Sequence, residues 1–483
     1  MTDSMMTTMS GSPVDKISPH AEPTDVCDTP LQPKDGQCAF YVLRKKRFCR
    51  FPPHSGKRYC AEHAVFAGVD LGRKRVQCPL NPKHTCYEDS LHKHLKKCVK
   101  MAKNINIYYE EGINAGDADG DDVPEQKFTV KQATREEVLE FIKRVNQLHK
   151  EYIGDITLED LTHESLKEEL SAPSYGFKVM RQRRQQASLI GHLQQMGFLT
   201  DGLCYVELGA GRGEFAHWVQ LAMDTCNDSS FVLVDKGTCR YKFDSFHKGE
   251  HQGPTFERLQ VNLADINLGK VPSISVSKRP VLGMGKHLCG DATDLALRCL
   301  TQTLTVGPAE HNSCNSRVPL EGLAIALCCH HRCSWPSYVG KPFIREQCGM
   351  SVAEFQLLSN MTSWATCSWE GWKKHVPRES TKDSSSSDGV QDMVSIGAGD
   401  QHENTNQTEH HQREFQSSNG FEKLDIGLTL EERENLGRKC KQLIDKGRVL
   451  YLQDNKMTAV LKAYIDQSYT PENIVLLAKP VSR

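Results

Sequence analysis

The stretch Tyr205–Glu214, YVELGAGRGE, leads from an apolar run through a glycine-rich turn into the start of a helical pattern. Gly209, Gly211 and Gly213 would let the backbone approach a ligand closely, although an ordinary tight turn also uses glycine. Asp235 ends the next apolar run, 26 residues after Gly209, where its carboxylate could accept hydrogen bonds from both hydroxyls of a ribose. The spacing predicts a strand, a turn and a helix that bind a nucleoside cofactor.

Helical patterns and short apolar runs alternate on both sides of this turn. Helices are predicted over residues 134–153, 181–196, 214–223, 291–300 and 429–455. Strands are predicted over residues 204–208, 231–234, 258–262, 281–284, 322–327, 457–465 and 473–479. Short apolar strands separated by helices are typical of a parallel sheet with helices on both faces, so we expect an α/β fold.

The sequence around the turn also carries a family likeness. Glu207 stands two residues before the first glycine, and ELGAGRG resembles motif I of class I S-adenosylmethionine-dependent methyltransferases. The resemblance implies that Glu207, the three glycines and Asp235 bind S-adenosyl-L-methionine, with Asp265 at the position that often holds the adenine. It also implies a Rossmann-like class I methyltransferase domain over residues 131–483, whose mostly parallel sheet has a terminal antiparallel strand.

Composition indicates which parts of the chain do not pack. Hydrophobic residues make up 38% of the 483 residues, and the mean hydropathy is −0.52. We expect a disordered tail over 1–33, an acidic linker over 104–130 and a disordered insertion over 376–420. The apolar runs are far shorter than the roughly 20 residues that span a bilayer, and the N-terminus lacks a signal peptide, so neither a membrane protein nor an exported one is expected.

Cysteine and histidine between residues 34 and 103 have the spacing of zinc ligands. The first predicted set, within residues 34–68, is Cys38, Cys49, Cys60 and His63. The second, within residues 74–103, is Cys78, His84, His94 and Cys98, with Cys86 and His92 as spare candidates. A basic segment with so few apolar residues needs a metal to fold, so we expect two small zinc-finger modules with about two zinc ions in all. Scattered core thiols and surface histidines are the alternative.

Charge is distributed very unevenly around these modules. Lys34 to Lys103 holds 17 basic and 5 acidic residues, a net charge of 17 − 5 = +12, whereas Ile105 to Gln126 holds seven acidic residues and no basic one. A basic module followed by an acidic tether is typical of a nucleic-acid-binding protein, although a solvated surface can look similar. The sequence RKKR at Arg44–Arg47 could contact phosphates or act as a nuclear localisation signal.

Two clusters of reactive side chains follow the predicted fourth and fifth strands. They are GKHLCGD at Gly285–Asp291 and CCHHRC at Cys328–Cys333. Open α/β proteins bind their ligands at the carboxyl ends of such strands. The second cluster could instead form a third metal site or a thiol-rich turn.

Together, both finger patterns, ELGAGRGE, GKHLCGDATDLALR (Gly285–Arg298) and ALCCHHRC (Ala326–Cys333) resemble the eukaryotic family of tRNA 2′-O-methyltransferases that modify the fourth nucleotide of the acceptor stem. The resemblance covers nearly all of the chain from residue 35, apart from the linker and the insertion. It implies methyl transfer to a ribose 2′-hydroxyl and the tRNA acceptor stem as partner. We expect no protein partner, and a location in the nucleus, the cytoplasm or both.

A ribose hydroxyl is a poor nucleophile, so the catalytic residues should handle its proton. Lys286 could stabilise the developing alkoxide if its own pKa is lowered, and His287 or His330 could take the proton. An RNA cytosine-C5 methyltransferase, in which Cys289 or Cys329 attacks the base, is the rival enzyme. A non-catalytic zinc-finger scaffold that binds RNA is the other alternative, and it would require damage to the glycines or Asp235, which are intact.

Overall fold

The computed structural model describes residues 32–42, 47–67, 69, 72–79, 81–97, 106–116, 128–171, 175–223, 226–239, 242–243, 246, 254–306, 317–367 and 426–481. The chain divides into two compact units, residues 1–106 and 107–483. Almost all of the tail predicted over 1–33 and the whole insertion predicted over 376–420 lie outside the described residues. Within the described part, no helix combines the length and the apolar character needed to cross a membrane.

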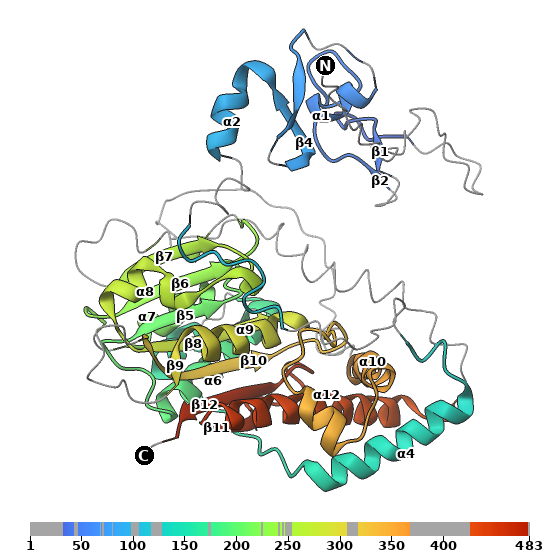
Figure 1. Cartoon of the computed structure of the whole chain (residues 1–483), viewed down its shortest axis with the longest axis vertical. Helices are drawn as coiled ribbons and strands as arrows, with labels where there is room; N and C mark the ends of the chain where they lie inside the picture. Colours follow the sequence, from blue (N-terminus) through green and yellow to red (C-terminus); the bar gives the residue numbers. More distant parts are fainter. Residues whose placement is uncertain are drawn as a thin grey trace, which may run out of the picture. The chain divides into compact units, whose positions relative to one another are not determined.

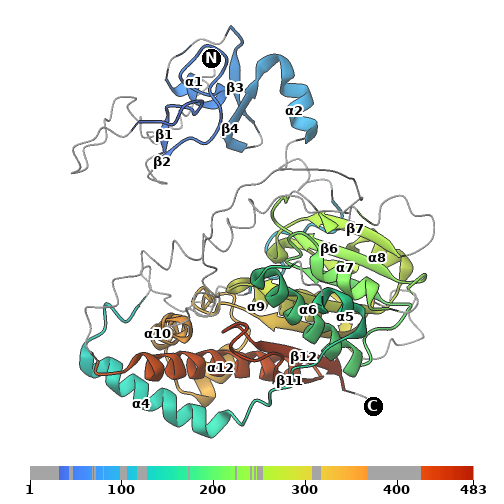
Figure 2. The same ribbon diagram turned by 180° about the vertical axis from the view of Figure 1, so that it is seen from behind.

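An eight-stranded sheet forms the centre of the larger unit, and helices cover both of its faces (Figures 1 and 2). Its strands are β5 (Cys204–Leu208), β6 (Ser230–Asp235), β7 (Thr255–Gln260), β8 (Val281–Leu288), β9 (Thr305–Val306), β10 (Pro319–Leu327), β11 (Met457–Ala463) and β12 (Ile474–Pro480). The spatial order is β11-β12-β10-β8-β5-β6-β7, with β9 beside β10. This order places the turn after β5 where the connections change direction, which is the usual ligand position in such sheets.

The sheet is mostly parallel, as the sequence predicts. Strands β7, β6, β5, β8 and β10 run parallel to one another, whereas β12 pairs antiparallel with both β10 and β11. The antiparallel strand is thus the last one along the chain, but it lies inside the sheet, and β11 forms the edge.

Two strand boundaries differ from the prediction. Strand β7 begins at Thr255, three residues earlier than expected. Strand β8 continues to Leu288, so Lys286 and His287 lie within the strand instead of after it. The register between β8 and β10 shifts after Gly285, and in this stretch Lys286 is buried and His287 is exposed. Glycine, lysine and histidine carry no strand signal of their own, and the strand continues past them to Leu288, which pairs with Leu327 of β10.

In the part of the larger unit that the structure describes, the α-helices are α4 (Arg135–Tyr152), α5 (Lys167–Ser171), α6 (Phe177–Gln195), α7 (Glu214–Leu221), α8 (Pro272–Ser277), α9 (Asp291–Thr303), α10 (Val352–Met361) and α12 (Leu430–Asp454). Helices α8, α9 and part of α12 share a core with one face of the sheet, and α6 and α7 share a core with the other. The amphipathic helix expected over 134–153 is confirmed as α4, which packs against α12 in a further core (Figure 1).

The acidic linker predicted over 104–130 is wrong for residues 107–116. Tyr109 forms an antiparallel bridge with Ile266, just after β7. The fully buried Asn114 donates from Nδ2 to the carbonyls of Leu263 at 2.7 Å and Ile266 at 2.8 Å. The sequence did not predict these contacts, because the segment is acidic and rich in glycine. A single buried asparagine that donates to backbone carbonyls produces no periodic pattern.

The smaller unit contains short elements. These are β1 (Tyr41–Val42), β2 (Arg47–Phe48), α1 (Ala61–Phe66), β3 (Arg75–Cys78), β4 (Asn81–Tyr87) and α2 (Leu91–Lys97). Strands β1 and β2 pair with each other, as do β3 and β4. Among the described residues of the first small module, Cys38, Cys49 and Cys60 are buried with Phe40 and Tyr59 packed against them, and Ala64 adds only a small buried apolar side chain.

Candidate active site and metal centre

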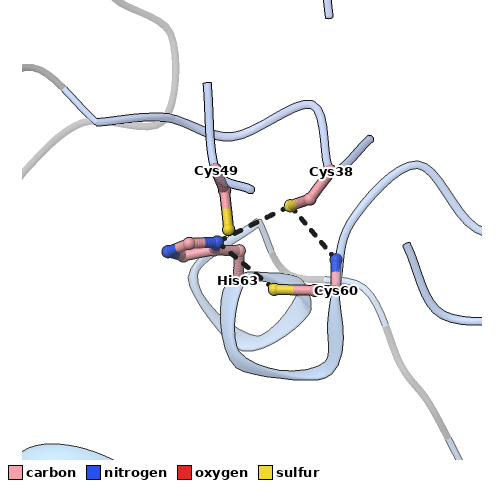
Figure 3. A group of neighbouring side chains, drawn as sticks. All are labelled: Cys38, Cys49, Cys60 and His63. Carbon is pink, nitrogen blue, oxygen red and sulfur yellow. Dashed lines mark hydrogen bonds between the residues drawn. The ribbon is translucent and has the colours of Figure 1, made fainter. Parts of the chain in front are cut away.

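The first predicted zinc set comes together in the structure. Figure 3 shows Cys38 and Cys49 converging on Cys60 and His63, which share one turn at the start of α1, and the four ligand atoms all lie within 4.8 Å of one another. Nδ1 of His63 lies 3.4 Å from Sγ of Cys60 and 3.6 Å from Sγ of Cys38. A tetrahedral zinc ion with ordinary bond lengths separates a sulfur from a nitrogen ligand by about 3.5 Å, so the four residues fit zinc.

Two further features of this site bear on cation binding. The ring of Phe40 stacks on that of His63 at 4.0 Å, which fixes the imidazole plane. Burial, together with the neighbouring thiols of Cys60 and Cys38, raises the pKa of Cys49 to about 11. A divalent cation removes this penalty because it stabilises the thiolates directly.

The second predicted zinc set is only partly described. Cys78 is buried at the end of β3, and His94 lies on α2. The position of Cys98 and the side chain of His84 lie outside the described residues. The grouping of these four ligands therefore stays a prediction. Cys86, a spare candidate, is buried on β4.

The glycine turn has the geometry that its sequence predicts. Gly209, Gly211 and Gly213 have φ angles of +66°, +50° and +78°, in the left-handed region that favours glycine. A Cβ at Gly209 would stand 2.8 Å from Cδ2 of Leu288, whereas a Cβ at Gly211 would meet no atom within 4 Å. The turn is therefore tight against β8 and open at Gly211, as a turn that cradles a ligand should be.

Asp235 lies at the end of β6 and faces this turn. Its Oδ2 accepts a hydrogen bond from the amide of Gly211 at 2.8 Å, and its Oδ1 accepts one from the amide of Gly237 at 2.7 Å. The side chain of Arg258 donates to the carbonyl of Gly211 at 2.7 Å. The carboxylate is thus held in a fixed orientation beside the open part of the turn.

Glu207, on β5, connects the strand before the glycine turn to the helix after it. Its side chain is buried, and Oε2 accepts a hydrogen bond of 3.1 Å from the amide of Ala216 in the first turn of α7. Burial raises the pKa of Glu207 to about 8. The bond to α7 ties the strand to the helix across the glycine turn, so the geometry favours a supporting role for Glu207 over direct contact with a ligand.

Asp265 is engaged by the segment that was expected to be a linker. Its Oδ1 accepts a hydrogen bond of 2.9 Å from the amide of Gly112, and its backbone carbonyl accepts one from Glu110. Glu110 is in turn paired with Lys270 at 2.7 Å. Residues 107–116 therefore pack directly against the acidic residue that was assigned to the adenine.

Lys286 is a buried charged group on β8. It is 8% exposed, and its Nζ donates to Oε1 of Gln182 on α6 at 2.6 Å. Burial lowers the pKa of Lys286 to about 8, although Glu214 acts in the opposite direction. Glu214 is the first residue of α7, directly after the glycine turn, and forms an ion pair with Arg183. A lysine with a pKa near neutrality thus lies beside the proposed cofactor turn.

The two histidines proposed as proton acceptors differ in their surroundings. His287 is exposed on β8. His330 is 3% exposed, and its Nε2 lies 2.7 Å from Oδ1 of Asp445 on α12. Among the described residues, no group forms a hydrogen bond with Nδ1 of His330. His330 and Asp445 also border a small pocket of about 90 Å³ together with Lys441.

The carboxylate that faces His330 belongs to a larger buried network. Arg448 donates from Nη1 to Asp445 at 2.9 Å and from Nη2 to Asp294 on α9 at 2.7 Å. Although burial acts in the opposite direction, His330 and Arg448 lower the pKa of Asp445. The carboxylate therefore stays ionised and orients the imidazole of His330.

The cysteines after β8 and β10 form a cluster. Sγ of Cys289 lies 3.1 Å from Sγ of Cys328, which lies 3.9 Å from Sγ of Cys329. Although its contact with Cys328 acts in the opposite direction, the Cys329 thiol and burial raise the pKa of Cys289 to about 12. Because a nucleophilic cysteine needs a lowered pKa, this arrangement does not favour the thiolate attack of the cytosine-C5 alternative.

Sequence reasoning missed three groups near these sites: Gln182, Glu214 and Asp445. Gln182, Gln185 and Gln186 place polar side chains along a helix whose next turns are buried. Polar residues at positions that face the interior were the signal that could have identified Gln182. Asp445 is 115 residues from His330 in the chain, so no local pattern could have paired them.

Three models of known protein families match separate parts of the chain. A family model described as "Methyltransferase TRM13" matches residues 184–479. A model described as "CCCH zinc finger in TRM13 protein" matches residues 36–64, and one described as "U11-48K-like CHHC zinc finger" matches residues 75–99. Both finger matches coincide with the two predicted zinc sets.

The chain is also similar to individual proteins along most of its length. The chain is 36% identical to the "tRNA:m(4)X modification enzyme TRM13 homolog" of Homo sapiens, over 96% of this chain and 97% of that protein. It is 35% identical to the Mus musculus protein of the same name, over 93% of this chain and 95% of that protein. The "tRNA:m(4)X modification enzyme TRM13" of Saccharomyces cerevisiae is 27% identical, over 91% of this chain and 95% of that protein.

Proposed function

The chain belongs to the TRM13 methyltransferase family, and we propose that it transfers a methyl group from S-adenosylmethionine to the ribose 2′-hydroxyl of the fourth nucleotide in the tRNA acceptor stem. The relatives' name, tRNA:m(4)X modification enzyme, supports tRNA as the substrate. The observation that carries the chemistry is the buried Lys286, which lies beside Glu214 at the end of the glycine turn and has a lowered pKa.

S-adenosylmethionine would be held by the glycine turn and by Asp235. The open space at Gly211 and the fixed carboxylate of Asp235 both fit a ribose-containing ligand. Asp265 remains the proposed adenine contact, through the carboxylate oxygen that Gly112 does not occupy. When bound, the cofactor supplies a methyl group on a sulfonium, which is already a strong electrophile.

The protein's own residues would then act on the ribose hydroxyl, which ionises only far above neutral pH. The ammonium of Lys286 is proposed to stabilise the negative charge that develops on the oxygen. His287 or His330 is proposed to accept the proton, and Asp445 supports His330 because a fixed carboxylate stabilises the imidazolium that forms.

The zinc-finger unit is proposed to bind the RNA backbone. The net charge of +12 between residues 34 and 103 would displace condensed counterions from the phosphates. Zinc is proposed at Cys38, Cys49, Cys60 and His63, and a second ion at the set that begins with Cys78. Each ion would fix a module that has too little apolar core to fold alone.

One assay tests the proposed reaction. The full-length protein is incubated with labelled S-adenosylmethionine and tRNA, and the digested nucleosides are separated; we expect label in 2′-O-methyl nucleosides that map to position four of the acceptor stem. Lys286→Ala should lower turnover strongly while the affinity for S-adenosylhomocysteine holds, and the exposed Lys143 provides the control Lys143→Ala. Label in methylated bases, or a trapped covalent RNA adduct, would favour the cytosine-C5 mechanism instead.

For the cellular location we propose the nucleus, the cytoplasm or both. The support is the basic sequence at Arg44–Arg47, of which only Arg47 is among the described residues. Microscopy of the tagged protein, with and without Lys45→Ala and Lys46→Ala, would show whether the sequence directs nuclear import.

A further inference from the structure

Three thiols lie close together at the carboxyl edge of the sheet, and none of them takes part in the proposed methyl transfer. They belong to Cys289, which follows β8, and to Cys328 and Cys329, which follow β10. Their sulfur atoms all lie within 4.8 Å of one another. Among the described residues, the only other group that the same criterion identifies is the first zinc-finger set. The cluster therefore has the ligand spacing that the chain uses in its zinc finger.

Hydrogen bonding and packing do not explain why three thiols meet here. A thiol is a weak donor and a weak acceptor, so contacts among thiols add little stability. A fully buried cysteine can pack as a small hydrophobic residue, but Cys289 and Cys328 are only half-buried. Thiolates, in contrast, are the ligands that zinc and other soft metal ions prefer, and one cation can bind all three sulfurs.

The pairing of β8 with β10 is irregular next to these cysteines, so a metal ion could help to hold the two strand ends together. The register between β8 and β10 shifts after Gly285 and Ile325, so the regular pairing of the two strands is interrupted. Beyond the shift, the amide of Gly290 donates to the carbonyl of Cys329 at 2.9 Å. An ion bound to Cys289 and Cys328 would join the two strand ends at this point.

We propose that Cys289, Cys328 and Cys329 bind a third zinc ion, which joins the ends of β8 and β10. Three sulfur ligands leave the fourth position of a tetrahedral ion open to water. Cys289 and Cys328 are half-buried, so an ion can enter from solvent. Cys289 directly follows the strand that carries Lys286, which lies three residues earlier, and the ion would hold that strand end in place.

Metal analysis of the full-length protein tests the proposal. Purified under reducing conditions and saturated with zinc, the wild-type protein should retain one equivalent more than a variant with Cys289→Ser and Cys328→Ser. Cys367→Ser is the matched control, because Cys367 is also half-buried but lies outside the cluster, and it should keep the full content. The finger variant Cys60→Ser should lose one equivalent independently of the double variant. Equal zinc content in the wild-type protein and the folded double variant would overturn the proposal.

A second measurement avoids any folding defect in the variants. The wild-type protein is treated with an alkylating reagent before and after removal of metal with a chelator, and the modified cysteines are identified by mass spectrometry. Cys289 and Cys328 should be protected until the chelator is added, whereas Cys367 should react equally in both samples. Equal reactivity of Cys289 and Cys328 in both samples, or a disulfide between them in place of bound metal, would contradict the proposal. Neither measurement uses tRNA or S-adenosylmethionine, so the result is independent of the proposed methyl transfer.

Discussion

Replacing Lys286 by methionine should stabilise the protein at pH 7 while it impairs catalysis. Burial lowers the pKa of Lys286 from 10.5 to about 8, so holding the protonated form in the folded state costs about 3 kcal/mol at about 1.4 kcal/mol per pKa unit. Methionine fills a similar volume without a charge. The lost hydrogen bond to Gln182 offsets about 1 kcal/mol, which leaves a net gain of about 2 kcal/mol.

The effect should depend on pH in a defined direction. Between pH 8 and pH 10.5 the unfolded chain binds more protons at Lys286 than the folded protein, so wild-type stability rises with pH in this window relative to the methionine variant. The contribution of the buried charge to the difference in free energy of unfolding should therefore be largest at pH 7 and nearly absent at pH 10.5, where only the lost hydrogen bond to Gln182 remains and the variant should be slightly less stable than wild type. Lys143→Met, at an exposed position, is the matched control for the same substitution outside the buried site.

Urea unfolding of the wild-type protein, Lys286→Met and Lys143→Met at pH 7 and pH 10 measures this directly. If Lys286→Met were no more stable than wild type at pH 7, or if its gain were the same at both pH values, the reasoning from burial would be refuted. The same variant should show a strongly reduced kcat, because the proposed role of Lys286 in stabilising the alkoxide requires its charge.

The remaining predictions concern the cofactor, the fingers and the substrate. Asp235→Ala should weaken S-adenosylhomocysteine binding by roughly tenfold or more, as expected for a lost charge-assisted hydrogen bond of about 1.5–3 kcal/mol, and calorimetry would show this; unchanged affinity would remove Asp235 from the cofactor site. Zinc content should fall by one ion in Cys60→Ser and by one in Cys98→Ser; metal content and folding unchanged in both would defeat the finger assignment. Affinity for tRNA should fall steeply as salt rises, and deletion of residues 1–103 should flatten this slope; an unchanged slope would give the fingers another role.

The parts of this protein that the sequence determined are those with local causes. The glycine turn was predictable because left-handed φ angles at Gly209, Gly211 and Gly213 are costly for other residues. Helix α4 was predictable because its apolar residues recur at helical spacing, and Thr134 and Glu137 form a capping box at its start. The first zinc set was predictable because thiol and imidazole ligands at these spacings have few other uses in a basic, core-poor segment.

Only the tertiary structure decided the features that depend on distant parts of the chain. Strand β8 continues past Lys286 to the pairing of Leu288 with β10, and burial, with Gln182 on α6 as hydrogen-bond partner, lowers the pKa of that lysine. The folding of residues 107–116 against Asp265 replaced an expected linker with a packed segment, across more than 150 residues of sequence. The spacing of apolar residues in the sequence predicts whether a segment is a helix or a strand and which of its faces is buried. Burial and charge at a single site depend on which elements meet there, so the environments of Lys286, Asp265 and His330 could come only from the folded chain.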